Sequence, residues 1–483
     1  MHPSDELFNL WVKKLQQRGD KKSKFTSKSA SNTASYTGKR YLHLDVPIEN
    51  ENPEDWKHTI LDEQAVSQRA FYPFLRIIKR NKRFHTNKNG VRCRHPEGPK
   101  ERPICSAAHR DSLVYSWYSF LLEDLLENRL NNSVLDECVL AYRAKGKNNL
   151  HFAKEVFEYV ASKDECTVLA FDVKGFFDNI DHTLLKRAWA DLLGGIKLPS
   201  DHYTVFKSMT CFRVIDLIAA EEILGEEEFA KCFYKQRIAY PKVFREKLLG
   251  IQITNPNKFG IPQGAPLSAV LSNIYMYKVD LELQQFADKH KGIYRRYSDD
   301  LLLVVPKSAA ELTISSVEGL LSGLKLNLNS KKTEVKHFDR TTSKLRCLNE
   351  QGRPSCIQYL GLEFNGEVIR IRPASLARFH HRLRRGVQKA VSHALYRGSL
   401  HQGKVFKRKL YEKFSHLGDS NFIAYSRRAS FITNSLSINK QLGDTVILVN
   451  NQIKRELARH SNPDFLVKRV KAKNFRKPKN KLK

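Results

Sequence analysis

Two short β-prone runs in this chain adjoin aspartates, and this pairing limits the folds that the chain can adopt. The run CTVLAFDV, residues 166–173, is apolar and β-branched and carries Asp172 near its end. The segment YRRYSDD, residues 294–300, leads into the run LLLVVP, so Asp299 and Asp300 lie between two strands, as at the tip of a hairpin. We therefore expect a buried sheet with carboxylates at its strand ends.

Three acids on neighbouring strand ends suit a two-metal site for phosphoryl transfer. Crowded carboxylates are unfavourable unless divalent cations neutralise them. Such cations lower the pKa of an attacking hydroxyl and neutralise the charge on a departing pyrophosphate. An adjacent Asp pair after an aromatic residue is also a common turn sequence, so this pattern alone leaves an ordinary turn open.

The flanking segments show helical and linker patterns. Apolar and aromatic residues recur at helical spacing in residues 112–130 and 149–161, which predicts two core helices. Residues 20–40 are rich in Ser, Thr and Lys and follow a short amphipathic start, so they are typical of a flexible linker. A length of 483 residues predicts two or three packed units.

The charge of the chain indicates a polyanionic partner. Its 83 Lys and Arg against 51 Asp and Glu give a net charge of +32, which suits nucleic acid or an anionic membrane. Residues 371–483 hold 27 Lys and Arg but five acids, and they predict a helical bundle with a basic face followed by a basic tail. The sequence shows no long apolar run and no signal-peptide core, so we expect a cytoplasmic protein with no membrane partner.

Several enzyme and metal-binding classes lack their motifs in this sequence. The eight cysteines are scattered without CxxC spacing, which disfavours a zinc knuckle or a disulfide framework. The motifs HExxH, GxxxxGK[ST] and GxSxG are absent, which disfavours a zincin, a P-loop ATPase and a standard serine hydrolase.

Five blocks follow one another along the chain, and two of them contain the aspartates described above. They are FDVKGFFDNIDH (171–182), GIPQGAPLSAVLSNIYM (260–276), YRRYSDDLLLV (294–304), LKLNLNSKKTE (324–334) and QYLGLEFNG (358–366). They resemble the successive palm motifs of reverse transcriptases, and KERPI (100–104) and AYRAKGKNN (141–149) resemble finger segments of the prokaryotic enzymes. The resemblance covers about residues 95–370.

The resemblance implies an α+β right-hand polymerase with a mixed palm sheet and a helical, basic thumb. The domains that it implies are an N-terminal extension with a flexible linker (1–40), fingers (41–165), palm (166–370), a helical basic thumb or C-terminal region (371–460) and a basic tail (461–483).

The resemblance also implies a metal site and a proton donor. Asp172, Asp299 and Asp300 match the aspartates that bind two Mg²⁺ ions, which Mn²⁺ can replace, and Val173 belongs to the same metal site. Lys332 matches a lysine that approaches the leaving pyrophosphate and protonates it as a general acid.

Nucleotide and primer contacts follow from the same resemblance. Lys100 and Arg102 match basic finger residues that hold the triphosphate, for which a surface salt bridge is the alternative. Phe177 matches an aromatic residue that leaves no room for a 2′-hydroxyl, and Gln263 matches a glutamine of the nucleotide pocket. The residues implied to contact primer or template are Gly264, Tyr297, Tyr359, Leu360 and Gly361.

The chain resembles most the stand-alone bacterial enzymes grouped as unknown-group or defence-associated reverse transcriptases, which are related to those of retrons and group II introns. This implies cDNA synthesis from dNTPs on a non-coding RNA template, in antiviral defence. Template-independent or protein-primed DNA synthesis on the same palm remains open. So do a retron or intron-derived enzyme, a non-catalytic RNA-binding scaffold and a homo-oligomer.

Overall fold

The computed structural model describes residues 3–20, 35–87, 90–330, 332–340, 343–396 and 403–461. Residues 21–34 of the predicted linker, and the predicted basic tail after Ser461, lie outside the described residues. The chain forms two compact units. The first unit comprises Met1–Arg143, Phe171–Leu302 and Glu311–Thr333, and the second comprises Ala144–Ala170, Leu303–Ala310 and Glu334–Lys483. The five domain limits expected from the sequence stay a prediction.

The first unit contains more helical than strand residues. Its α-helices are α1 (Pro3–Asp20), α2 (Glu54–Leu61), α3 (Glu63–Ser67), α4 (His109–Asn131), α6 (His182–Leu192), α7 (Ser200–Thr210), α8 (Leu217–Leu224), α9 (Glu226–Lys235), α10 (Pro241–Val243), α11 (Ser268–Lys289) and nearly all of α12 (Ala310–Gly323). Short turns of other helix types are η1 (Phe176–Asp178), η2 (Phe244–Leu248) and η3 (Leu249–Ile251).

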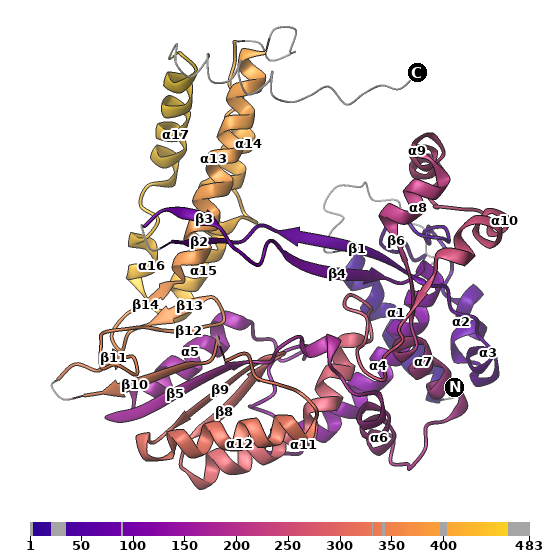
Figure 1. Cartoon of the computed structure of the whole chain (residues 1–483), viewed down its shortest axis with the longest axis horizontal. Coiled ribbons are helices and arrows are strands. Elements are labelled where there is room, and N and C mark those ends of the chain that lie inside the picture. Colours follow the sequence, from indigo (N-terminus) through magenta and orange to yellow (C-terminus); the bar gives the residue numbers. More distant parts are fainter. Residues whose placement is uncertain are drawn as a thin grey trace. The chain divides into compact units, whose positions relative to one another are not determined.

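The strands of the first unit form a mixed sheet and a small hairpin. They are β1 (Phe74–Asn81), β2 (Phe84–Thr86), β3 (Arg92–Arg94), β4 (Lys100–Ser106), β6 (Arg213–Asp216) and β7 (Ile253–Thr254). A further strand of this unit, β8 (Ile293–Tyr297), belongs to another sheet. The sheet order is β4-β1-β6-β7, in which β1 is antiparallel to β4 and parallel to β6. Figure 1 shows β1 and β4 as a long two-stranded ribbon that continues into the β2–β3 hairpin.

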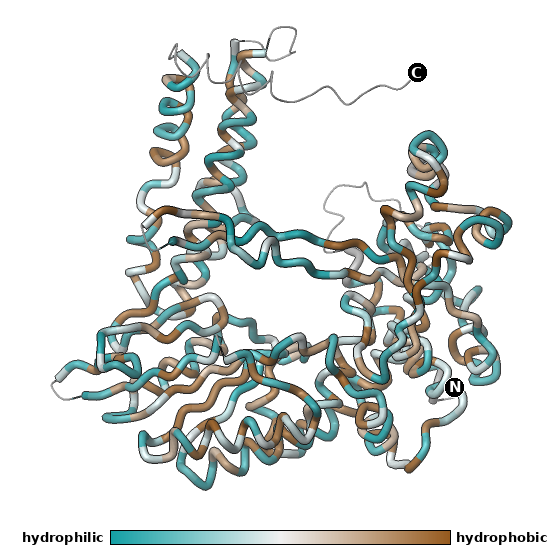
Figure 2. Tube along the Cα trace, viewed as in Figure 1, coloured by the Kyte–Doolittle hydropathy of each residue, from teal (hydrophilic) through white to brown (hydrophobic). Residues whose placement is uncertain are grey.

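Two strands run from one unit into the other, namely β5 (Glu165–Asp172) and β9 (Asp300–Val305). They belong to a five-stranded sheet of order β11-β10-β5-β9-β8. Hydrophobic residues are concentrated along β9, and Leu301–Val305 are buried (Figure 2). Asp300, the first residue of β9, therefore lies at the end of a buried strand.

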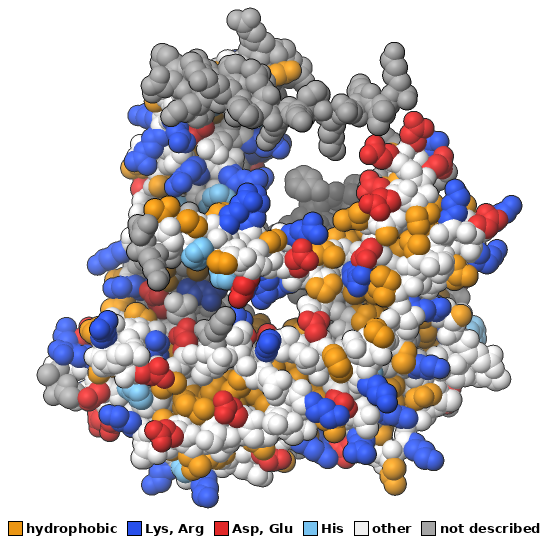
Figure 3. Space-filling view, viewed as in Figure 1, with side chains coloured by type: hydrophobic (Ala, Val, Ile, Leu, Met, Phe, Trp, Pro, Cys, Tyr) orange, Lys and Arg blue, Asp and Glu red, His pale blue; other side chains and the backbone are white. Residues whose placement is uncertain are grey.

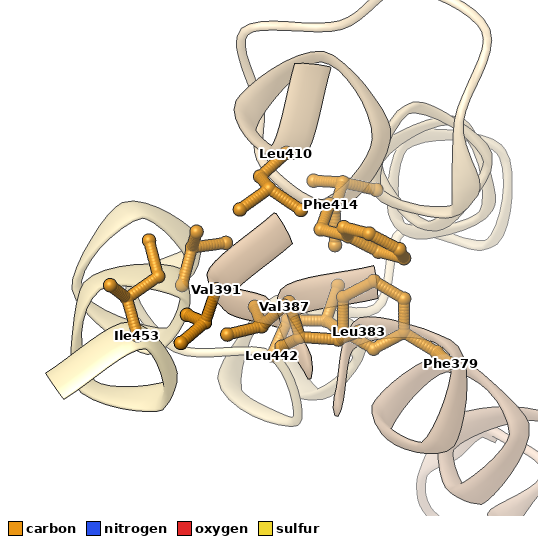
Figure 4. Packing of buried hydrophobic residues seen from close by; sticks show 10 residues of the cluster. Phe379, Leu383, Val387, Val391, Leu410, Phe414, Leu442 and Ile453 are labelled. Carbon is orange, nitrogen blue, oxygen red and sulfur yellow. The ribbon is translucent and has the colours of Figure 1, made fainter. Parts of the chain in front are cut away.

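The second unit combines short strands with a helical bundle. Its elements are α5 (Asn149–Ala161), η4 (Lys307–Ala309), β10 (Glu334–Asp339), β11 (Arg346–Leu348), β12 (Ile357–Tyr359), β13 (Leu362–Phe364), β14 (Ile369–Ile371), α13 (Pro373–Leu395), α14 (Arg408–Phe414), α15 (Phe422–Thr433), α16 (Leu436–Lys440) and α17 (Thr445–His460). Phe379, Leu383, Val387 and Val391 recur at helical spacing on α13 and pack against apolar residues of α14 and α17 (Figure 4).

The local predictions agree with these elements. The helix expected over residues 112–130 is α4, the helix expected over 149–161 is α5, and the strand expected over 166–173 is β5. The segment that carries Asp299 and Asp300 is a hairpin of β8 and β9, as expected. The whole is an α+β fold with mixed sheets. None of the helices in the described residues is long and apolar enough to cross a membrane.

Candidate active site

The ends of β5 and of the β8–β9 hairpin meet within the first unit. Asp172 is the last residue of β5, and Asp299 lies in the turn before Asp300 starts β9. The backbone N–H of Val173 donates a hydrogen bond of 3.2 Å to the carbonyl oxygen of Asp299. This bond fixes the backbone of Asp172 next to that of Asp299, as the two strand-end motifs predicted.

A loop that follows α12 holds the carboxylate of Asp172. The Lys332 Nζ lies 2.5 Å from Asp172 Oδ1, and Asn329 Nδ2 donates a 3.1 Å hydrogen bond to Asp172 Oδ2. The backbone N–H of Asn329 also donates to the carbonyl oxygen of Asp172, over 2.8 Å. Lys332, predicted from the sequence, and Asn329, which was not, therefore act on the same acid. The signal for Asn329 was its position in the block LKLNLNSKKTE.

The donors at these strand ends suit a hard divalent cation. Carboxylate oxygens are preferred ligands of Mg²⁺ and Mn²⁺. In the part of the chain that the structure describes, no three His, Cys, Asp or Glu side chains group closely enough to hold a metal ion. Asp172 is neutralised by the ammonium group of Lys332 instead. The chemistry of the donors fits a divalent metal, and the joining of Asp172, Asp299 and Asp300 in one ligand set stays a prediction.

A buried ion pair connects the β8–β9 hairpin to α11. Arg296 on β8 and Asp280 on α11 are both fully buried, and Nε and Nη2 of the guanidinium each donate a 2.7 Å hydrogen bond to the carboxylate. The Tyr294 hydroxyl donates to the same carboxylate over 2.7 Å. Arg296 Nη1 donates over 3.1 Å to the carbonyl oxygen of Ser298, the residue before Asp299. The pair thus ties the turn to α11.

The segment after β5 carries Phe177, which the sequence predicts to contact the nucleotide. Phe176 is buried, whereas Phe177 is half-buried. The carbonyl oxygen of Phe177 accepts a 2.9 Å hydrogen bond from the N–H of Ile261, which joins this segment to the GIPQGAP block. Gly260 has a φ of +89°, and a Cβ there would lie 3.0 Å from the carbonyl oxygen of Asp178. The glycine is therefore required by this close approach.

Gln263 contacts both the segment after β5 and strand β4. Its Nε2 donates a 3.1 Å hydrogen bond to Asp178 Oδ1, and its carbonyl oxygen accepts a 2.8 Å bond from the N–H of Cys105. Burial raises the pKa of Asp178, while the bond from Gln263 opposes that rise. Gly264 has a φ of +110°, and a Cβ there would lie 2.9 Å from the carbonyl oxygen of Cys105. The block is thus packed tightly against β4.

The ribbon of β1 and β4 carries several cations toward this region. Lys100 and Arg102 lie on β4, opposite Asn81 and Lys79 of β1, and alternate residues of a strand share a face. Burial lowers the pKa of the Lys100 ammonium, and the positive charges of Arg102, Lys332 and Arg83 lower it further.

The positive charge of Lys332, which pairs with Asp172, therefore acts on Lys100 as well. Positive charges gathered in this way favour the binding of an anionic ligand. Lys79, on the face of Arg102, was missed by the sequence analysis because only strand register shows it.

The predicted primer residues of the last block lie in the second unit. Tyr359 is buried at the end of β12, and the carbonyl oxygen of Leu360 accepts a 2.9 Å hydrogen bond from Asn149 Nδ2. Leu360 and Gly361 have φ values of +46° and +94°. Tyr297, at the end of β8 in the first unit, is half-buried, and burial raises its pKa. The roles of these residues stay predictions.

The structure is an α+β protein with aspartates at neighbouring strand ends, and comparison with known families gives its class. Residues 116–364, a little more than half of the chain, match the family described as reverse transcriptase (RNA-dependent DNA polymerase). The chain belongs to the reverse transcriptase family. Members of this family are RNA-directed DNA polymerases, which use divalent metal ions and bind an RNA template and DNA.

Solved structures of telomerases show distant similarity to the chain. The telomerase from Candida albicans, solved in complex with the TWJ fragment of telomeric RNA, is 14% identical with a TM-score of 0.41. That match covers 85% of this chain and 66% of the telomerase chain. The apo telomerase from Candida tropicalis is 11% identical with a TM-score of 0.39, over 70% of this chain and 56% of its own. This chain thus spans less than two thirds of the length of these telomerases.

Proposed function

We propose that this chain is an RNA-directed DNA polymerase that makes cDNA by two-metal nucleotidyl transfer. The observation that carries the proposal is the junction of β5 with the β8–β9 turn. There the N–H of Val173 bonds to the carbonyl oxygen of Asp299, and Lys332 and Asn329 hold the carboxylate of Asp172. Membership of the reverse transcriptase family supports the same chemistry.

In this proposal Asp172, Asp299 and Asp300 hold the metal ions, with Val173 beside them. Bound divalent cations lower the pKa of the primer hydroxyl and neutralise charge on the departing pyrophosphate. Lys332 moves from Asp172 to the leaving pyrophosphate and donates a proton there from its Nζ.

Residues around the pocket orient the nucleotide. Lys100 and Arg102 bind the triphosphate, because an ammonium and a guanidinium both form charge-assisted hydrogen bonds with phosphate oxygens. Phe177 packs under the sugar and excludes a 2′-hydroxyl. Gln263 contacts the nucleotide from the side of the GIPQGAP block. Its carbonyl bond to Cys105 keeps this block in register with β4.

A right-hand arrangement of fingers, palm and thumb belongs to the same proposal, with the second unit's helices gripping RNA. Figure 3 shows Lys and Arg side chains gathered along α13 and α17. The exposed cations of α13 are Arg378, Arg382, Arg384, Arg385 and Lys389, and those of α17 are Lys454, Arg455 and Arg459. A basic surface on packed helices suits A-form RNA, which proteins hold through phosphates and 2′-hydroxyls.

The proposed biological role is bacterial antiviral defence in the cytoplasm, with a non-coding RNA as template. The support is the resemblance to stand-alone, defence-associated enzymes. A phage plating assay tests this role with the gene intact and with Asp299→Asn. Equal plating on both strains would contradict it.

The polymerase proposal is tested by primer extension with Mg²⁺ and dNTPs on RNA that co-purifies with the protein. Wild-type protein is expected to make DNA complementary to that RNA, and Asp299→Asn is expected to make none while melting at the wild-type temperature. Asp124→Asn, which changes an exposed carboxylate on α4, is the matched control and should keep activity.

The remaining outcomes separate the alternatives. DNA without a complementary RNA would indicate untemplated synthesis, and DNA bonded covalently to the protein would indicate protein priming. RNA binding without any DNA synthesis would indicate a non-catalytic RNA-binding scaffold.

A further inference from the structure

Tyr142 lies beside the hairpin turn that carries Asp299 and Asp300. Its hydroxyl is 3.1 Å from the Oγ of Ser298, within hydrogen-bond distance. The residue is 49% exposed, so its ring is not a core element of the first unit. Its φ of +64° is in the left-handed region, which a bulky residue rarely adopts.

Ser298 shares this unusual conformation. It is 7% exposed and has a φ of +61°. Its two chain neighbours are Tyr297 and Asp299, so the conformation of Ser298 sets the direction in which the turn presents Asp299. Tyr142 and Ser298 are thus both non-glycine residues in the left-handed region, and their side chains are within hydrogen-bond distance of each other. Such backbone conformations persist only where the surrounding contacts stabilise them.

The backbone on both sides of this contact is held firmly. The N–H of Leu140 donates to the carbonyl oxygen of Arg296 over 2.9 Å, and the N–H of Arg296 donates to that of Cys138 over 2.8 Å. Asn273 Nδ2 donates to the carbonyl oxygen of Ala141 over 3.1 Å. The segment before Tyr142 is thus fixed both to β8 and to α11, and it brings the tyrosine hydroxyl to the turn.

We propose that Tyr142 is a positioning residue for the Asp299–Asp300 turn and acts through Ser298. The inference rests on the proposed metal-binding function of that turn. Arg296 holds the carbonyl oxygen of Ser298 from inside the fold, and Tyr142 holds its hydroxyl from the solvent side. Together they limit rotation of the turn, and preorganised ligands bind a metal ion with less loss of freedom.

Tyr142→Phe tests the inference, because it removes one hydroxyl from a half-exposed ring. Two readouts are the dissociation constant of Mn²⁺, measured by electron paramagnetic resonance without primer or dNTP, and the Mg²⁺ midpoint of primer extension. Loss of one neutral hydrogen bond predicts a change of about two- to tenfold in each. The melting temperature should stay at the wild-type value. Tyr203→Phe, in which a 43% exposed tyrosine on α7 loses its hydroxyl, is the matched control and should leave all three values unchanged.

A double-mutant cycle identifies the partner. Ser298→Ala should weaken Mn²⁺ binding to a similar degree, and adding Tyr142→Phe to it should have no further effect, since one bond cannot be lost twice. The inference would be overturned, and the proposed function would stand, if the two substitutions had additive effects on Mn²⁺ binding or if Tyr142→Phe bound Mn²⁺ as wild type does. Wild-type protein that neither binds Mn²⁺ nor extends a primer would overturn the proposed function, and the inference with it.

Discussion

Replacing Asp280 by Asn should destabilise the first unit strongly, because it leaves the Arg296 guanidinium buried without a counter-charge. Both side chains have no exposed surface, and the two hydrogen bonds between them are 2.7 Å long. The same carboxylate accepts the hydroxyl of Tyr294. Removing one partner of a buried ion pair costs about 3–5 kcal/mol, since the remaining charge keeps its desolvation penalty. We expect a loss of that size in the free energy of unfolding.

Urea unfolding followed by tryptophan fluorescence measures this loss. The four tryptophans of the chain, Trp11, Trp56, Trp117 and Trp189, all lie in the first unit. Glu282→Gln, which changes an exposed carboxylate on the same helix, is the matched control and should shift the free energy by less than about 0.5 kcal/mol.

A second variant separates the charge from the packing. Asp280→Leu combined with Arg296→Met removes both charges and should cost less than Asp280→Asn alone. The reasoning would be refuted if Asp280→Asn lost less than about 1 kcal/mol, or if the double variant were the less stable of the two.

Three further predictions concern the pocket and its support. Phe177→Ala should increase rNTP incorporation relative to dNTP in primer extension, because the 2′-hydroxyl gains room; unchanged sugar discrimination would remove this assignment. Gly264→Ala should cost at least about 1–2 kcal/mol of stability and raise the KM for dNTP, because the new Cβ would meet the carbonyl oxygen of Cys105 at 2.9 Å; a wild-type KM would contradict this. Burial lowers the pKa of His43 to about 4. Between about pH 6.5 and pH 4 the unfolded chain therefore binds a proton at this histidine that the native state does not bind. The stability of wild type relative to His43→Gln should therefore fall between pH 6.5 and pH 4 and level off below, and urea titrations showing no such slope would contradict it.

The local elements could be predicted from the sequence because short-range patterns determine them. Residues 149–161 repeat apolar side chains at helical spacing, and α5 has these same limits. The turn at Asp299 follows from the two β-prone runs that flank it. By contrast, the burial of Phe8 and Trp11 on α1 against Trp56 and Trp117 required tertiary packing that a short amphipathic pattern does not specify.

The contacts that support the candidate site were less predictable for a similar reason. The pair of Asp280 and Arg296 joins a helix to a strand, and each residue alone resembles a surface charge in the sequence. Lys79 lies opposite Arg102 through the register of β1 with β4, which the sequence of neither strand fixes. Tyr142 reaches Ser298 across 156 residues. Motifs therefore located the acids, while the groups that orient them required the three-dimensional structure.

The charges around the candidate site indicate how ligands would affect one another there. Lys332 neutralises Asp172 in this structure, yet burial, together with the charges of Arg102, Lys332 and Arg83, lowers the pKa of Lys100, with Asp172 as the opposing charge. Positive charges that repel one another reduce stability unless a ligand compensates them. In the proposed function a nucleotide triphosphate would supply that compensation, and it would draw Lys332 away from Asp172. The carboxylate would then be free for a metal ion, so binding of nucleotide and of metal should favour each other at this site.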